Sequence, residues 1–245
     1  MAEGILYLRN NNNDFVWIEN EAPEKGDGKY VGQIENGEPS GYGVFTYPSG
    51  ERYEGEWKNG KRHGNGAYID PDGREYNGGW KDGGGEGKGK ITWKNGDQYY
   101  GEIKNGEMDG EGVFKWVDGD LYEGNYKNGR RHGNGKYTHA DGKKFVGHWE
   151  NGKIQGQGSL SYPDGTNYEG QWKNSKLNGH GIYNGFSGEK YEGKWKNGKY
   201  DGHGIYTFSD GTIWKGEWKE DKPWNIIEYT KFGLINGKIV NGVQE

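Results

Sequence analysis

Aromatic, glycine and polar residues recur along the chain with a period of 23 residues, from Tyr30 to Ile213. Glycine occupies position 2 of every unit when the first residue is counted as position 0, and it also fills positions 11, 13 and 20 of the complete units. The eight complete units begin at Tyr30, Tyr53, Tyr76, Tyr99, Tyr122, Phe145, Tyr168 and Tyr191, and a truncated ninth begins at Trp214. A period of this length is typical of an array of stacked supersecondary units.

An Asn-Gly pair stands at positions 6 and 7 in six of the units, as in Asn59-Gly60 and Asn128-Gly129. This pair favours a two-residue hairpin turn, because both central residues of that turn take positive φ. We therefore predict one β-hairpin per unit, in which position 5 pairs with 8, 4 with 9, 2 with 11 and 0 with 13. The glycine at position 20 is expected to turn the chain into the next unit.

Side chains alternate across a strand, so this register places positions 0, 2, 4, 9, 11, 13 and 15 on one face. In the second unit that face carries Tyr53, Trp57 and Tyr68 among glycines, while Glu54 and Lys58 point to the opposite face. Each position-0 ring is expected to lie flat over the glycine opposite it. The predicted fold is all-β: an elongated single-layer array of eight to nine 23-residue β-hairpin repeats with a curved aromatic groove.

The pattern divides the chain into residues 1–29, 30–213 and 214–245. Apolar residues 5–8 and 15–18 flank a run of asparagines and predict an N-terminal capping hairpin. The last part combines a degenerate ninth repeat with a C-terminal cap, in which Asn236-Gly237 predicts the turn of a final hairpin that covers the sheet edge.

Composition excludes a conventional aliphatic core, since 50 of the 245 residues are glycine. The chain has 11 Trp, 19 Tyr and 7 Phe, however, and this aromatic content argues against disorder. The absence of cysteine excludes disulfides and thiolate chemistry, and a net charge of −5 does not favour a nucleic-acid partner. The acidic, Asn-rich start fits neither a signal peptide nor a membrane span, so we expect a cytoplasmic protein, including one peripheral to the membrane or cytoskeleton.

The repeats suggest no catalytic or metal site. The six histidines are spread over five units, and carboxylates such as Glu54 and Glu56 share an open, charged face where nothing would perturb their pKa. We predict no enzymatic activity, no metal and no cofactor.

The aromatic face is the strongest candidate for binding, because a single-layer sheet leaves nothing to cover it and Trp and Tyr are enriched among binding hot spots. Alternatively, the rings and glycines satisfy one another and simply form the core. The predicted groove residues are Tyr53, Trp57, Trp80, Tyr122, Trp149, Trp172, Trp195 and Trp218.

Two basic pairs, Lys61-Arg62 and Arg130-Arg131, follow hairpin turns. Cations in such a place attract anionic lipid headgroups. Acidic residues outnumber basic ones in this chain, and a solvated hairpin rim is the alternative explanation.

The unit Tyr-x-Gly-x-Trp-x-Asn-Gly-x-x-x-Gly-x-Gly, as in residues 53–66, resembles the MORN repeat (membrane occupation and recognition nexus). The resemblance covers residues 30 to about 219 and implies serial hairpins in a groove-bearing sheet. It also implies scaffolding, membrane-skeleton junctions, phosphoinositide binding and self-association, and not an enzyme.

We therefore predict a non-catalytic scaffold or adaptor that binds a protein segment, or a second copy of itself as a homodimer, through the aromatic groove or a sheet edge. One alternative is a peripheral membrane module that binds anionic phospholipids, including phosphoinositides. The other is a purely structural spacer, natural or engineered.

Overall fold

The computed structural model describes residues 2–11 and 14–245, and its regular elements are all β-strands. The chain forms two compact units: an N-terminal unit that runs to Asp118 and includes Tyr126–Gly129, and a C-terminal unit of Gly119–Asn125 and Arg130–Glu245. Each unit is an open antiparallel sheet, one layer thick, in which the strong contacts join paired strands. In the described part of the chain, no helix is long and apolar enough to span a membrane.

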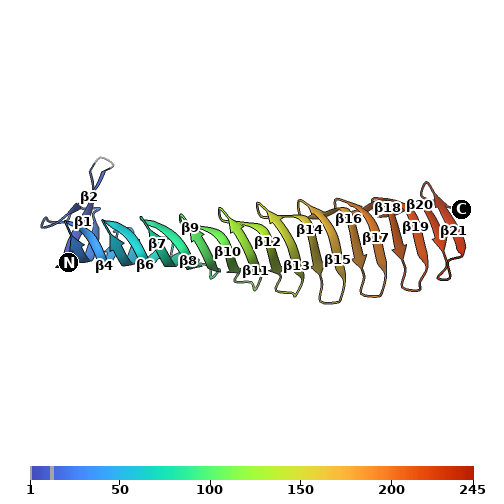
Figure 1. Cartoon of the computed structure of the whole chain (residues 1–245), viewed down its shortest axis with the longest axis horizontal. Helices are drawn as coiled ribbons and strands as arrows, with labels where there is room; N and C mark the ends of the chain where they lie inside the picture. The colour runs from blue at the N-terminus through green and yellow to red at the C-terminus, as the bar shows by residue number, and fades with distance from the viewer. Residues whose placement is uncertain (1, 12–13) are drawn as a thin grey trace. The chain divides into compact units, whose positions relative to one another are not determined.

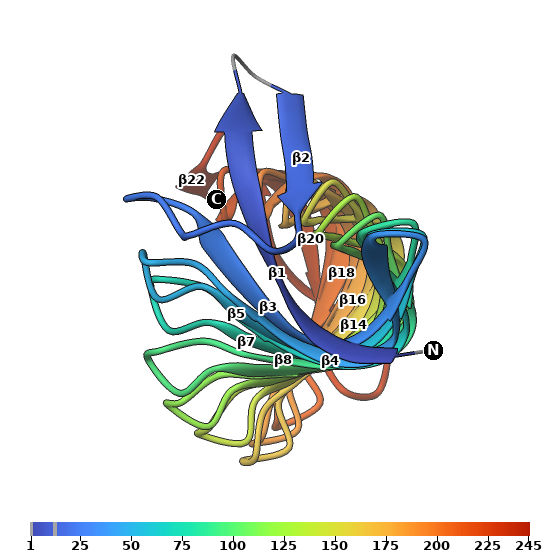
Figure 2. The same ribbon diagram turned by 90° about the vertical axis from the view of Figure 1, so that its left-hand side faces the viewer.

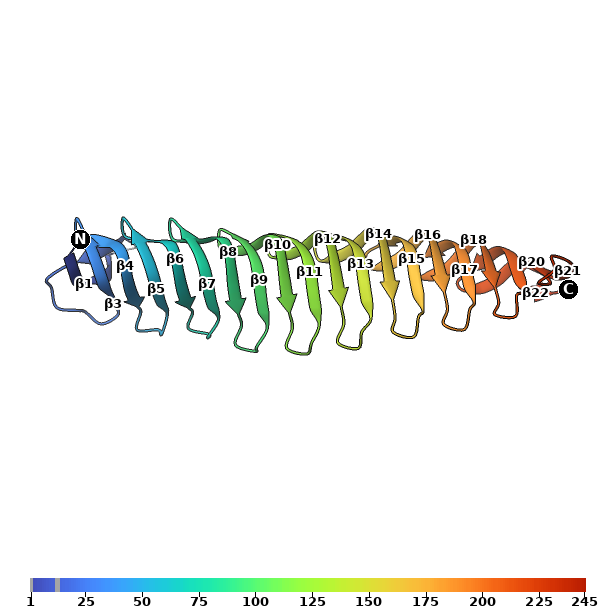
Figure 3. The ribbon, with the colours of Figure 1, turned by 60° about the horizontal axis from the view of Figure 1, so that its bottom comes forward.

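The strands follow the chain in order (Figure 1). The N-terminal unit contains β1 (Ala2–Asn11), β2 (Asp14–Ile18), β3 (Gly28–Glu35), β4 (Glu38–Thr46), β5 (Arg52–Lys58), β6 (Lys61–Ile69), β7 (Glu75–Lys81), β8 (Gly84–Thr92), β9 (Gln98–Lys104) and β10 (Glu107–Lys115). Strand β11 (Leu121–Lys127) contributes residues to both units. The C-terminal unit continues with β12 (Arg130–Thr138), β13 (Lys144–Glu150), β14 (Lys153–Ser161), β15 (Asn167–Lys173), β16 (Lys176–Asn184), β17 (Lys190–Lys196), β18 (Lys199–Thr207), β19 (Ile213–Lys219), β20 (Lys222–Tyr229), β21 (Ile235–Val240) and β22 (Val243–Gln244) (Figure 3).

The hairpin turns lie at positions 6 and 7, as predicted. Asn59 and Gly60 have φ angles of 49° and 70°, and Asn174-Ser175, which lacks the glycine, takes the same conformation with 50° and 63°. The glycine at position 20 also has positive φ, for example 95° at Gly50, where the chain enters the next repeat. The predicted all-β array of 23-residue hairpin repeats is confirmed.

The predicted register is right next to the turn and wrong beyond it. In the second repeat Trp57 pairs with Arg62, position 4 with 9, as expected. Position 2 then pairs with 13 instead of 11, and position 0 with 15 instead of 13, so that Tyr53 stands opposite Tyr68 and not opposite a glycine. A bulge accounts for this shift of two residues, because residues 63–65 stand opposite the single residue Glu56. Within the bulge Gly64 has a φ of 59°, a backbone conformation that favours glycine.

The position-0 rings nevertheless cover glycines, namely those at positions 2 and 13. An ideal Cβ on Gly112 would lie 2.4 Å from the ring of Tyr99. The Tyr99 hydroxyl donates a hydrogen bond of 2.8 Å to the carbonyl oxygen of Glu102 at position 3. The same bond forms in six repeats, from Tyr30, Tyr53, Tyr76, Tyr99, Tyr122 and Tyr191.

Four of the indoles at position 4 bond to the preceding repeat. Trp80 Nε1 donates a hydrogen bond of 3.1 Å to the carbonyl oxygen of Gly66, the position-13 glycine of that repeat. The bond recurs from Trp57, Trp172 and Trp195, whereas the buried Nε1 atoms of Trp149 and Trp218 have no hydrogen-bond partner among the described residues. Where the bond forms, it joins a repeat to its successor, as expected for an array stabilised by nearest-neighbour contacts.

The N-terminal segment forms the predicted hairpin, with Tyr7 paired to Ile18, and β1 also pairs with β3 (Figure 2). Asn12 and Asn13, from the run at its tip, lie outside the described residues. Trp17 of this hairpin packs edge-on against Phe45 and Trp57, with ring centroids 5.6 and 6.0 Å away.

The predicted C-terminal turn is wrong. Asn236-Gly237 lies inside β21, and Gly237 does not have positive φ. The chain turns instead at Asn241-Gly242, with φ angles of 53° and 81°, which leaves only the short β22 beyond it. Gly233, with a φ of 81°, already turns the chain between β20 and β21, so Asn236-Gly237 is used as strand.

A candidate binding groove on the ring face

The eight aromatic residues predicted to line the groove are buried. They lie on the face that carries positions 0 and 4, which we call the ring face, and none of their side chains is more than 8% exposed. The structure brings Tyr53, Trp57 and Trp80 together in the N-terminal unit, where the Tyr53 and Trp80 centroids are 5.1 Å apart. The C-terminal unit contains the other five: Tyr122, Trp149, Trp172, Trp195 and Trp218.

Half-exposed rings at positions 15 and 17 form the accessible part of the ring face. They pack edge-on within a repeat, as in the Tyr206–Phe208 pair, whose centroids are 4.7 Å apart, and Tyr47 packs in the same way against the buried Phe45 at 4.6 Å. Sequence reasoning placed position 15 on this face without singling these rings out. The half-exposed rings are Tyr47, Tyr68, Trp93, Phe114, Trp116, Tyr137, Tyr162, Tyr183, Tyr206 and Phe208.

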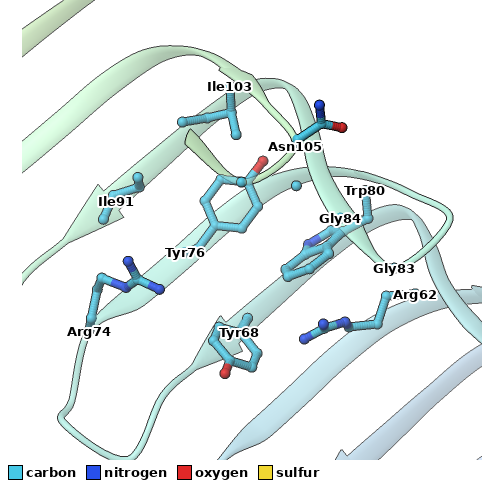
Figure 4. Close-up of a pocket in the computed structure, with 12 residues that line it drawn as sticks. Arg62, Tyr68, Arg74, Tyr76, Trp80, Gly83, Gly84, Ile91, Ile103 and Asn105 are labelled. Atoms are coloured by element: carbon cyan, nitrogen blue, oxygen red, sulfur yellow. The ribbon is translucent and has the colours of Figure 1, made fainter. Parts of the chain in front are cut away.

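Two adjoining hollows open on the ring face of the N-terminal unit. The first has a volume of about 260 Å³ and lies between Tyr76, Trp80, Ile91 and Ile103 (Figure 4). The second, of about 250 Å³, is lined by the rings of Trp17, Phe45, Tyr47, Tyr53 and Trp57. Arg62, Tyr68 and Gly83 line both hollows, so the two adjoin and share these residues as a wall.

Two departures from the repeat pattern open the first hollow. Position 9 of the third repeat is Gly85, where the corresponding residues of other repeats include Arg62 and Leu177. Position 4 of the fourth repeat is Ile103, which is smaller than the tryptophan found there in most repeats. The missing side-chain volume is left as a cavity lined by the remaining rings.

Arg62 lies on the ring face, where the alternation of side chains also places position 9. Its guanidinium carbon is 4.5 Å from the centroid of the Trp80 ring and 5.1 Å from that of Tyr68 (Figure 4). The neighbouring Lys61 is exposed. This stacking is a cation–π arrangement that leaves the edge of the guanidinium available for hydrogen bonds.

Arg131 repeats this arrangement in the C-terminal unit, with distances of 4.3 Å to Trp149 and 5.2 Å to Tyr137, while Arg130 is exposed. A hollow of about 340 Å³ lies beside it, also lined by Phe145 and other apolar side chains.

Among residues 2–11 and 14–245, no three His, Asp or Glu side chains come together in a group that could hold a metal ion.

Two solved structures resemble this fold distantly. The TCP10 domain of Danio rerio CPAP, in complex with a peptide of Danio rerio STIL, is 12% identical, with a TM-score of 0.45, and the match covers 86% of this chain and 99% of that one. The Drosophila melanogaster SAS-4 (dCPAP) TCP domain, in complex with a proline-rich motif of Ana2 (dSTIL), is 15% identical, with a TM-score of 0.38 and coverage of 61% and 81%. Comparison with curated proteins gave no match.

The sequence matches the MORN repeat in eight segments, most of which share their boundaries with the periodic units described above. The matched residues are 30–52, 53–73, 76–98, 99–121, 122–144, 145–167, 168–190 and 191–213. These segments cover most of the chain, and MORN repeats are generally non-catalytic. The chain therefore belongs to the MORN repeat family.

Proposed function

We propose that this protein is a non-catalytic scaffold or adaptor whose ring face binds an extended or helical segment of another protein. The observation that carries the proposal is the pair of adjoining hollows on the ring face of the N-terminal unit, with their shared wall at Arg62 and Tyr68. Concave apolar surfaces with a few polar groups are the usual form of a binding site.

The buried tryptophans have a different part in this proposal from the one the sequence suggested. They form the floor of the groove, where their rings and the glycines stabilise the sheet. The contact surface is provided by the half-exposed rings above them, such as Tyr47 and Tyr68 in the N-terminal unit. Tyrosine suits this role because its ring gives apolar contact area and its hydroxyl remains available for hydrogen bonds.

Selection of peptides on the folded protein tests the proposal. A displayed library of random 12-residue peptides is panned on the immobilised full chain, and enriched peptides are synthesised and titrated by fluorescence polarisation. We expect Tyr47→Ala/Tyr68→Ala to weaken binding by at least 10-fold. The matched control is Tyr42→Ala/Tyr100→Ala, which removes two tyrosines that are 54% and 61% exposed on the opposite face.

The two double variants decide between the faces of the sheet. Retained affinity in the Tyr42→Ala/Tyr100→Ala protein, together with the loss in the ring-face variant, supports the groove. Failure to enrich any peptide, or equal losses in both variants, contradicts the proposal. Circular dichroism and thermal unfolding of each variant separate a lost contact from a lost fold.

Binding of anionic phospholipids, self-association and a cytoplasmic location stay predictions. For lipid binding, Lys61 and Arg130 are exposed at the hairpin turns, whereas Arg62 and Arg131 lie on aromatic rings. For self-association, the C-terminal segment exposes Phe232, and β22 has a single strand partner among the described residues. These features are weaker than two adjoining hollows on the ring face, so the protein-segment partner is preferred.

A further inference from the structure

We infer that the ring face of each unit carries a subsite for an acidic side chain of a bound segment, at Arg62 in the N-terminal unit and at Arg131 in the C-terminal unit. Each subsite would take the carboxylate of an Asp or Glu residue whose apolar neighbour enters the adjoining hollow. The inference rests on the proposed function and adds to it the chemical class of the recognised segment.

The two subsites are repeats of one another in sequence. Residues 61–66 (KRHGNG) and 130–135 (RRHGNG) lie three repeats apart and differ at one position. Among the eight complete repeats, these two are the only ones with arginine at position 9, and also the only ones with a basic residue at position 21, Arg74 and Lys143. The two repeats with arginine at position 9 are thus also the two with a basic residue at position 21. In each repeat these two residues line the same hollow.

The Arg62 guanidinium is held in place without a carboxylate partner among the described residues. Three rings surround it: Trp80 at 4.5 Å, Tyr68 at 5.1 Å and Tyr53 at 5.9 Å. A guanidinium that lies against rings keeps its N–H groups at the rim, where a carboxylate can accept two parallel hydrogen bonds. The side chain is already ordered, so little further entropy is lost when an anion binds.

None of the neighbouring charged residues forms an ion pair with Arg62 within the described part of the chain. Arg74 Nε lies 3.0 Å from the Asp70 carboxylate, so that pair is neutral. Glu51 lines the second hollow together with Arg62, and burial and the Glu51 carboxylate raise the pKa of Tyr68. Lys61, the next residue along the strand, is exposed.

The second subsite is more strongly positive. Arg131 donates a 3.4 Å hydrogen bond to the carbonyl oxygen of Gly152, and Lys143 Nζ lies 5.4 Å above the ring of Tyr162. The nearby carboxylate, Asp120, is already engaged: Tyr137 donates to it, the Ala140 amide donates to it at 2.9 Å, and His139 Nδ1 lies 3.2 Å away. Arg131 itself forms no ion pair within the described residues, so its guanidinium can bind a carboxylate of a ligand.

A carboxylate suits these subsites better than a phosphate or a lipid headgroup. A phosphate carries close to two negative charges and is usually bound by several cations, whereas the first subsite offers one uncompensated guanidinium. A membrane surface would reach the exposed Lys61 and Arg130 before the stacked arginines. The hollows, of about 260 and 340 Å³, add an apolar contact that a free anion would not use.

The test uses the full chain, the displayed random 12-residue peptides and five proteins. They are the wild type, Arg62→Gln, Arg131→Gln, their double variant, and the control Lys58→Gln/Lys127→Gln, which makes the same change in charge at two exposed lysines of position 5. We expect peptides enriched on the wild type to contain Asp or Glu beside an apolar residue. Affinity should fall by about 5- to 10-fold in one or both single variants and by at least 10-fold in the double variant, and by less than 2-fold in the control.

A double-mutant cycle assigns the contact. Replacing the peptide's acidic residue by its amide should weaken binding to the wild type by a similar factor and cause no further loss on the arginine variant. Peptides that bind through Tyr47 and Tyr68 but show no acidic preference and no loss with the arginine variants would overturn this inference and leave the proposed function standing. If no peptide is enriched at all, both fail.

Two further outcomes would also overturn the inference. One is preference for phosphopeptides over their acidic counterparts in the same titration. The other is sedimentation with vesicles of 70% phosphatidylcholine and 30% phosphatidylserine that depends on Arg62 and Arg131. Thermal unfolding of every variant shows whether the fold is retained, and Arg62→Lys, which keeps the charge but not the planar fork, should recover only part of the affinity.

Discussion

The ring of Tyr99 lies so close over Gly112 that a Cβ at residue 112 would come within 2.4 Å of ring atoms. The Tyr99 side chain is fully buried although the sheet is only one layer thick. Main chain and ring therefore form the two sides of a very thin core, in which glycine takes the place that apolar side chains occupy in a thicker fold. The contact recurs in neighbouring repeats, so it is the natural target for tests of stability.

Gly112→Ala should destabilise the protein by about 1–3 kcal/mol, because the added methyl group forces the Tyr99 ring off the sheet. Urea unfolding followed by tryptophan fluorescence measures the change. The control is Gly237→Ala in β21, where φ is not positive and the nearest atom to the new Cβ is 3.9 Å away. Equal losses in the two variants would contradict the tight packing at Gly112.

Tyr99→Phe should cost about 1 kcal/mol, because the carbonyl oxygen of Glu102 loses the hydrogen bond that the hydroxyl donates. The adjacent Tyr100 is 61% exposed, so Tyr100→Phe changes the same chemical group without removing a buried contact. Thermal unfolding of both variants checks the prediction. A melting temperature lowered as much by Tyr100→Phe as by Tyr99→Phe would count against it.

Stability should fall in alkaline solution. Burial raises the pKa of Tyr30, Tyr76 and Tyr122 to about 12, compared with about 10 for an exposed tyrosine. Below about pH 10 both states keep the phenol protons, and stability is complete. Above that pH the unfolded chain releases its protons first, so the free energy of unfolding falls as the pH rises through about 12.

Urea unfolding at pH 8, 10 and 11, together with tyrosinate absorbance, measures this effect. Tyr76→Phe should make the decline less steep than in the wild type, because one of the shifted groups is removed. A free energy of unfolding that stays constant between pH 8 and 11 would contradict the prediction.

Trp17→Ala should open the N-terminal end of the array and leave distant repeats unchanged. Trp17 packs against Tyr30, Phe45 and Trp57, and an array held by nearest-neighbour contacts transmits such a loss only locally. Hydrogen exchange should therefore speed up in β3–β5 and stay the same in β15–β19. Phe15→Ala, at a 60% exposed residue of the same strand, is the control and should change neither region.

The repeat length, the turns within the repeats and the ring face were predictable, because the recurring glycines and asparagines indicate where φ is positive. The bulge was not predictable in the same way. Positions 11 and 13 are both glycine, and only the backbone shows that Gly64 is needed for its φ of 59° whereas Gly66 is needed for its bare surface beneath Tyr53. Residue type alone does not separate these two reasons for a glycine.

The candidate site was predictable as a face but not residue by residue. The largest rings, such as Trp149, were expected to line the groove, yet they are buried, because in so thin a core the largest rings are needed to cover the main chain. The hollow beside Gly85 and Ile103 depends on side chains that are smaller than the pattern requires. A search for departures from the repeat, in addition to its regular positions, could have found it.

The hydrogen bond from Trp80 to Gly66 has a consequence for how such a protein can change its length in evolution. Duplication or deletion of one whole repeat keeps each bonded indole 14 residues after its acceptor, whatever the number of copies. An insertion of another size within β6 or β7 would separate donor from acceptor and shift the side chains that follow. Gene rearrangements in whole units therefore preserve these bonds.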